Sequence, residues 1–361
     1  MEQTTHDVAV VGAGVAGTAC ALLAARQGLH VILIEKQPRN ESLLRPDWLP
    51  SRARALLAGW KIDLGPLIGP PFKGATFHST DLSKHTDTTE TEPPAFRIDY
   101  SRLVGHLRDC ARRTGVDLHH YPDAAAIACG EKSVRLTWAD REPVEARFLV
   151  RADGTQQPAE AETGVWIAEL HLAGLDASAP DRLHWILGLD RWRALASWWS
   201  DEARVVVRLA ASGAPDELRQ RLVTCANRAV SQRWLNGRPR IESSKVMLRA
   251  APPTNALERE SHVDKRTLWI GDAGGFVSTA TREGIEPALR SAALAVETLV
   301  AAARHRTPQD VLQKYDVAWR SEMAEELGTP ETHVLLLLPL VFRNTQMAQR
   351  LAGVFWYGRP A

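Results

Sequence analysis

The amino-acid sequence predicts an α/β protein, in which an antiparallel sheet is inserted into a parallel, helix-covered sheet and helices form the C-terminal part. Residues 7–35 have the pattern of a strand, a glycine turn, a helix and a second strand. Residues 266–304 repeat the strand, the glycine turn and the helix. Between these units apolar and polar residues alternate, as they do in antiparallel strands. With 361 residues, the chain is long enough for about two domains.

The composition excludes several classes of protein. Lys+Arg total 44 and Asp+Glu total 43, and a formal net charge of +1 gives no support for nucleic-acid binding. The four cysteines form no C-x-x-C pair, which predicts reduced thiols in a cytoplasmic protein. No apolar run approaches the roughly 20 residues that span a bilayer, so we expect no transmembrane segment. The pair His119-His120 has no third ligand at metal spacing, and we expect no metal site.

The first unit has the full context of a dinucleotide-binding motif. Asp7–Val11 is a short β-branched strand, and the G-x-G-x-x-G sequence Gly12–Gly17 follows it. The Ala/Leu-rich segment Thr18–Gln27 is the predicted helix, Val31–Ile34 is the second strand, and Glu35 ends that strand. Strand, glycine turn, helix, strand and acid are the order that a Rossmann-type site requires.

Each part of this motif has a physical role. Gly12 permits the tight turn, Gly14 lets a pyrophosphate approach the backbone, and Gly17 lets the helix pack on the strand. The helix N-terminus offers N–H groups to the phosphates, and Glu35 can accept hydrogen bonds from a ribose without a 2′-phosphate, which favours NAD or FAD over NADP. The residues predicted to hold the cofactor here are Gly12, Gly14, Val15, Ala16, Gly17, Glu35 and Lys36.

The second unit favours FAD over NAD. The strand Arg266–Ile270 leads into the sequence GDAGGF, and a helix is predicted over Ala288–Arg304. An Asp at the end of a strand can bond a sugar-like hydroxyl, and a second helix N-terminus can stabilise the charge that develops on a reduced flavin ring. An enzyme that uses only NAD needs no such element. The candidate cofactor residues are Gly271, Asp272, Gly284 and Ile285.

Together, the early G-x-G-x-x-G and the late GDAGGF…EGI…ALRSA resemble the FAD-dependent flavoproteins of the p-hydroxybenzoate hydroxylase superfamily, above all the geranylgeranyl reductase-like branch. The stretches Ile98–Val116, Leu149–Gly154 and Tyr315–Leu327 fit the same family, and the similarity is weakest over about residues 160–255. The resemblance implies a Rossmann-type FAD-binding domain of the GR2 type, an inserted antiparallel substrate sheet and C-terminal helices.

The resemblance also implies roles for single residues. Gly284 and Ile285 would face the pyrimidine edge of the flavin, and Asp272 would bind the ribityl chain or the pyrophosphate. Arg102 would lie near the cofactor, and Asp153 with its neighbour Gly154 would support the cofactor-binding loop. The chain departs from the family pattern at Arg282, where a glycine is usual, and at Ser278-Thr279-Ala280, where Asp-Pro is usual. These departures predict an altered turn near the flavin.

The middle of the chain is the expected substrate side. Its predicted strands are Val134–Trp138, Val165–Leu172, Arg182–Leu189 and Ala203–Leu209, and a helix is predicted over Asp216–Trp234. Five of the twelve tryptophans gather there, either as core or as an aromatic wall over the flavin. They are Trp166, Trp185, Trp192, Trp198 and Trp199.

Catalytic side chains stand out only weakly. Tyr100, His184 and Trp185 are the candidates, each with a structural role as the alternative. The arginines Arg108, Arg112 and Arg113 fit a solvated helix face. The predicted domains are a discontinuous FAD-binding domain (1–75, 96–155 and 256–305), a substrate domain (76–95 and 156–255) and a C-terminal helical segment (306–361).

Three functions remain open from the sequence. The favoured hypothesis is a flavin monooxygenase that hydroxylates an aromatic or apolar substrate, a small molecule or a protein side chain, through a flavin hydroperoxide. The second is a C=C reductase of the geranylgeranyl reductase type, and the third is a non-catalytic flavin-binding maturation partner. Because there is no second G-x-G-x-x-G, NAD(P)H would bind transiently or a partner reductase would supply electrons. Substrate identity and oligomeric state stay open.

Overall fold

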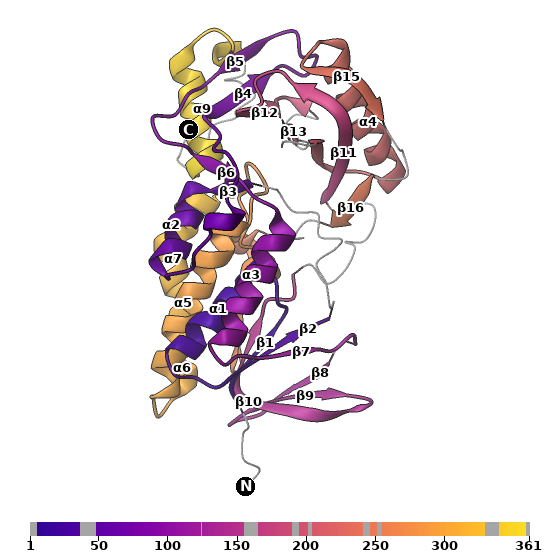
Figure 1. Cartoon of the computed structure of the whole chain (residues 1–361). Helices are drawn as coiled ribbons and strands as arrows, with labels where there is room; N and C mark the ends of the chain where they lie inside the picture. Colours follow the sequence, from indigo (N-terminus) through magenta and orange to yellow (C-terminus); the bar gives the residue numbers. More distant parts are fainter. Residues whose placement is uncertain are drawn as a thin grey trace.

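Two sheets and a set of long helices make up the protein in the computed structural model (Figure 1). The structure describes residues 6–36, 48–123, 125–154, 165–189, 195–200, 204–240, 246–250, 255–328 and 339–358. None of the helices within these ranges is both long and apolar enough to cross a membrane.

The first sheet has a parallel centre, in the order β17-β18-β10-β1-β2-β7. β1 pairs in parallel with β2 and β10, and β10 pairs in parallel with β18. The antiparallel strands β8 and β9 extend it from β10. Its strands are β1 (His6–Val11), β2 (Val31–Glu35), β7 (Asp117–His120), β8 (Ala126–Cys129), β9 (Val134–Trp138), β10 (Arg141–Arg151), β17 (Val263–Asp264) and β18 (Thr267–Trp269).

Helices cover one face of this sheet and the β8–β9 hairpin covers the other (Figure 1). Val8 and Val10 point into the helical core, whereas Ala9 packs with Val134 and Leu136 of the hairpin. This alternation is what a strand with two buried faces requires. The helices are α1 (Val15–Arg26), α2 (Ser51–Gly59), α3 (Tyr100–Arg113), α5 (Ile285–Ala303), α6 (Pro308–Leu312) and α7 (Lys314–Leu327).

The second sheet is almost wholly antiparallel, in the order β15-β11-β14-β13-β12-β4-β5, with β16 also paired to β11. One face packs on α4, and the opposite face packs in part on α9. Its elements are β4 (Gly74–His78), β5 (His85–Asp87), β11 (Val165–Ala177), β12 (Arg182–Ile186), β13 (Leu195–Ser200), β14 (Arg204–Ser212), β15 (Leu235–Arg240), β16 (Met247–Ala250), α4 (Pro215–Ser231) and α9 (Thr345–Tyr357).

Short elements connect the two sheets. The strands β3 (Trp48–Pro50) and β6 (Ala95–Arg97) form a two-stranded ribbon between them. Single 3-10 turns lie at η1 (Gly65–Leu67), η4 (Ala256–Glu258) and η5 (Gly271–Gly274).

The predicted fold class is confirmed, with differences in detail. The strand predicted over Val134–Trp138 forms as β9, but it belongs to the first sheet and not to the inserted one. Sequence analysis missed β13, because its run of small and tryptophan residues shows no polar alternation. The predicted domain boundaries stay a prediction.

Candidate flavin site

The two glycine turns, more than 250 residues apart in the sequence, meet at the N-terminus of α1. A Cβ on Gly271 would lie 2.7 Å from the Cβ of Ala16, so the turns are in direct contact. Gly12 has φ +99° and a Cβ there would lie 2.3 Å from the Ala152 carbonyl oxygen. A Cβ on Gly17 would lie 1.8 Å from the oxygen of Gly12. Both glycines are therefore required by the protein's own backbone packing.

Gly14 differs, because it is open toward the solvent side of the turn. A Cβ on it would meet only the Tyr100 hydroxyl, at 3.9 Å. Gly14 is the N-cap of α1, no side chain caps this end, and the first turn has no acidic residue. The backbone N–H groups and the dipole of such a helix end favour a phosphate. The glycine cradle thus fits the pyrophosphate of FAD, and Tyr100 lies beside that cradle.

Glu35 is held in place by a buried arginine. Its Oε2 accepts hydrogen bonds from the Ala13 N–H at 2.8 Å and from Arg108 at 2.9 Å. Nε of Arg108 also donates to the Ala13 carbonyl, at 2.8 Å. The expectation of a solvated Arg108 is wrong, since Arg108 is 7% exposed, whereas Arg112 and Arg113 are exposed.

The helical period explains this difference. On α3 the buried Val104, Arg108 and Ala111 follow one another at spacings of four and three, which places Arg108 on the inner face. A charged residue is normally expected on the exposed face of a helix, which is why Arg108 was predicted to be solvated. Its spacing from the apolar Val104 and Ala111 could have identified it as buried.

Two of the predicted aspartates lie at the ends of adjacent strands. Asp153 follows β10, pairs with Arg151 at 2.6 Å, and its Cα would be 2.7 Å from a Cβ on Gly12. Asp272 lies in η5 after β18, and its Oδ1 would be 3.1 Å from a Cβ on Gly284. Asp153 thus supports the first turn, and Asp272 connects the second turn to the start of α5.

The N-terminus of α5 already carries a carboxylate. Glu283 is 5% exposed, and its Oε1 accepts a hydrogen bond from the N–H of Ile285. Burial, and to a smaller extent the charge of Glu286, raises the pKa of Glu283 to about 8. The preceding Arg282 has φ +58°, so the position where the family has glycine keeps the left-handed backbone that glycine favours.

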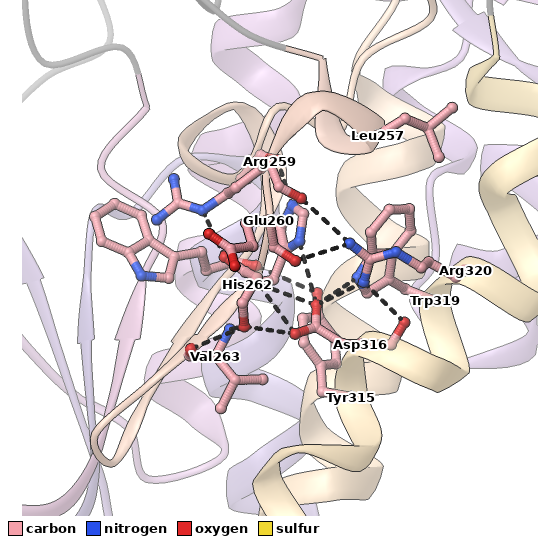
Figure 2. A network of polar contacts seen from close by, with 12 residues as sticks. Leu257, Arg259, Glu260, His262, Val263, Tyr315, Asp316, Trp319 and Arg320 are labelled. Atoms are coloured by element: carbon pink, nitrogen blue, oxygen red, sulfur yellow. Dashed lines mark hydrogen bonds and ion pairs between the residues drawn. The ribbon is translucent and has the colours of Figure 1, made fainter.

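A buried histidine connects the second glycine turn to the C-terminal helices (Figure 2). Nε2 of His262 lies 2.7 Å from the Gly274 carbonyl, and its Nδ1 lies 3.4 Å from Oδ1 of Asp316 on α7. Burial alone would raise the pKa of Asp316, but hydrogen bonds from His262, Ser261 and Trp319 outweigh it and lower that pKa. The network therefore connects the second glycine turn to α7.

A charged group lies on the face of the second sheet that is turned away from α4. Arg208 Nε is 3.6 Å from Oε1 of Glu169, and both are almost fully buried. His171 accepts from Arg204 at Nδ1 (2.7 Å), so its Nε2 carries the proton that faces Glu169 at 3.6 Å. The positive charge of Arg208 also lowers the pKa of Glu283, against the larger effect of burial.

Sequence analysis did not identify this charged group. The pattern was present, because charged residues at alternate positions of β11 and β14 interrupt otherwise apolar strands. A strand with one apolar and one charged buried face indicates a site on the charged side.

The other candidates lie elsewhere. His184 is 1% exposed on the α4 side of its sheet, where it bonds His78 at 3.0 Å and stacks on Trp198, and burial lowers its pKa to about 4. Trp185 packs edge-on against Phe355 of α9. Arg102 and Lys36 are exposed, and Arg102 lies 3.5 Å from the Pro66 carbonyl. Trp192 lies outside the described residues.

Comparison with known proteins gives matches along most of the chain. The profile of the FAD binding domain family matches residues 5–328. A menaquinone reductase of Mycobacterium tuberculosis is 26% identical over 329 residues, which cover 81% of this chain and 76% of the relative. A digeranylgeranylglycerophospholipid reductase 2 of Methanothermobacter thermautotrophicus is 26% identical over 357 residues, which cover 89% and 85%.

Two further matches are informative. A geranylgeranyl bacteriochlorophyll reductase-like protein from Thermoplasma acidophilum has a TM-score of 0.72 at 19% identity, over 88% of this chain and 83% of its own, and shows a shared fold. A tetracenomycin A2 monooxygenase-dioxygenase of Streptomyces glaucescens is 25% identical over 191 residues, which cover 44% of this chain and 34% of the relative.

Proposed function

Because the chain belongs to the FAD binding domain family, and is thereby an FAD-dependent oxidoreductase, we propose that it reduces carbon–carbon double bonds of an apolar, isoprenoid-containing substrate. The resemblance to geranylgeranyl reductase-like flavoproteins is confirmed. Two relatives named as reductases, of menaquinone and of a digeranylgeranyl phospholipid, match more than four fifths of the chain. The contact between the two glycine turns supports FAD binding, because it assembles one continuous cradle, and the two reductase relatives support the choice of reaction.

We assign the binding of FAD to residues at this cradle. The N–H groups at the start of α1 would hold the pyrophosphate beside Gly14, and Glu35 would accept from the ribose while Arg108 fixes its carboxylate. Asp272 and the N-terminus of α5 would lie at the flavin half. When bound, FAD supplies two-electron redox chemistry.

The chain's own residues supply position and a dry environment. On the face of the second sheet that is turned away from α4, Glu169 and Arg208 are buried and contact the half-buried His171 and Arg204, and a charged group of this kind can orient one polar group of a substrate. The electron donor is a nicotinamide that binds transiently or a partner reductase. We keep Tyr100 as a group beside the pyrophosphate, because its hydroxyl lies near Gly14.

The experiment reduces the FAD-loaded protein without oxygen and adds menaquinone or a digeranylgeranyl phospholipid. Mass spectrometry then reads the product. A gain of two hydrogen atoms per double bond is expected. Gly14→Val is the negative control, because its side chain blocks the cradle. Gly105→Val is the matched control, because a Cβ at Gly105 meets nothing within 4 Å. Unchanged substrate with fully reduced, bound FAD would refute the proposal.

A monooxygenase is the second candidate. The match to the tetracenomycin A2 monooxygenase-dioxygenase favours it, although that match covers less than half of the chain. In the same experiment, admitting oxygen would then add one oxygen atom to an aromatic or apolar substrate. If FAD is bound and neither product forms with any donor, a non-catalytic flavin-binding role is favoured instead.

A further inference from the structure

Glu283 is a carboxylate in an unusual place, at the N-terminus of the helix that starts beside the flavin half of the cradle. It is 5% exposed, and its Oε1 accepts a hydrogen bond from the N–H of Ile285. No direct ion pair of Glu283 is among the interactions that the described part of the chain shows. A carboxylate without a direct cationic partner in such a site readily binds a proton.

Charged groups on three elements lie around Glu283. Glu286 of α5 raises its proton affinity, and Arg208 of β14 lowers it. Asp272 of η5 lies next to Gly284. Next to Glu286, a network of ion pairs joins α2, α5 and α7. Arg52 lies 3.2 Å from Glu286, and both Arg52 and Arg290 pair with Glu326.

A small cavity leads from Glu283 toward this network. It has a volume of about 40 Å³ and is lined by Glu283, Glu286, Ser278, Thr281 and Arg290, together with aromatic residues of α9. At about 10–15 Å³ for each water, it has room for about three water molecules. Waters in a cavity of this size, lined by these polar groups as well as by apolar side chains, can connect a buried carboxylate to solvent through hydrogen bonds.

We propose that, in alkaline solution, Glu283 is the proton-binding group of the flavin site, taking up a proton from solvent through this cavity when FAD is reduced and returning it when FAD is oxidised. The proposal rests on the placement of FAD given above. Reduction would bring two electrons and one proton to the bound cofactor, which would leave one negative charge beside Glu283. The second proton binds the carboxylate oxygen of Glu283, so that two electrons and two protons enter in total.

Electrostatics gives the size of the coupling. A negative charge about 5 Å from a carboxylate, at an effective dielectric constant of about 20, would raise its proton affinity about 250-fold. Because burial already raises the pKa of Glu283 to about 8, this group is mostly protonated at neutral pH, where reduction adds no further proton to it, and mostly ionised in the oxidised protein at about pH 9. Reduction at that pH is the condition in which the extra proton becomes measurable.

The test measures proton uptake with a pH indicator during anaerobic photoreduction of the FAD-loaded protein. The wild type is expected to take up nearly two protons per two electrons at about pH 9, and one proton well above the raised pKa. Glu283→Gln is expected to take up only one proton at about pH 9. Glu297→Gln, an exposed position on the same helix, is the matched control and should behave as the wild type.

Several results would overturn the proposal. One is a wild type that takes up a single proton across the whole pH range, which decides the question even if Glu283→Gln fails to fold. Another is loss of the second proton in Glu286→Gln but not in Glu283→Gln. A wild type that binds no FAD would instead refute the proposed function, so the two failures are distinguishable.

Discussion

The substitution Arg108→Met tests whether a buried ion pair positions Glu35 for the cofactor. Methionine keeps the length and apolar stem of the side chain but removes its charge and its hydrogen bonds to Glu35 and to the Ala13 carbonyl. The side chains of Arg108 and Glu35 are 9% and 17% exposed, so the remaining carboxylate would stay largely desolvated.

The structure sets the expected magnitude. Removing one partner of a buried ion pair costs about 3–5 kcal/mol, and the partial exposure of Glu35 places the expected loss of unfolding free energy at about 2–3 kcal/mol. Because Glu35 would also lose its orientation, FAD affinity should fall about tenfold. The matched control is Arg112→Met on the same helix. Its pair with Asp109 is more than half exposed, and we expect a change below about 0.5 kcal/mol.

Urea unfolding followed by circular dichroism measures the stability, and flavin fluorescence measures the affinity. The double variant with Glu35→Gln should be more stable than the sum of the two single losses predicts, because it removes both members of the pair. If Arg108→Met is as stable as Arg112→Met and binds FAD as tightly, the assignment of Arg108 as the partner that holds Glu35 is refuted.

Four further outcomes are expected. Gly14→Val should fold like Gly105→Val but bind FAD at least 100-fold more weakly (roughly, for a blocked phosphate contact), as equilibrium dialysis would show; equal affinities would contradict the cradle. Arg282→Gly should raise the unfolding free energy by about 1 kcal/mol, because φ +58° strains arginine. Between its ordinary pKa and about pH 8, Glu283 keeps its proton in the folded protein and loses it in the unfolded chain. Its contribution to the unfolding free energy is therefore full below its ordinary pKa and falls as the pH rises toward about 8. Glu283→Gln should make the unfolding free energy depend less on pH, as urea titrations at several pH values would show. Trp185→Leu should lower the unfolding free energy by about 3 kcal/mol while leaving FAD affinity unchanged, since this side chain is 2% exposed and packs on α9; a selective loss of FAD would place it at the site.

The sequence by itself determined the cofactor class, the two glycine turns and the elements that carry them. These are local properties: a glycine turn between a strand and a helix is encoded within some thirty adjacent residues. The effect of the substitution at Arg282 was not among these properties: the sequence predicted an altered turn, whereas the structure gives Arg282 the left-handed backbone that glycine favours, with φ +58°.

Tertiary structure alone decided which charged residues are buried and what they face. Arg108 reaches Glu35 across 73 positions of the chain, and Arg208 acts on Glu283 from the other sheet. His184 and Trp185 are neighbours in sequence, yet they lie on opposite faces of one strand, in two different cores. Such electrostatic and packing relations depend on distance in space, which the spacing of residues along the chain does not encode.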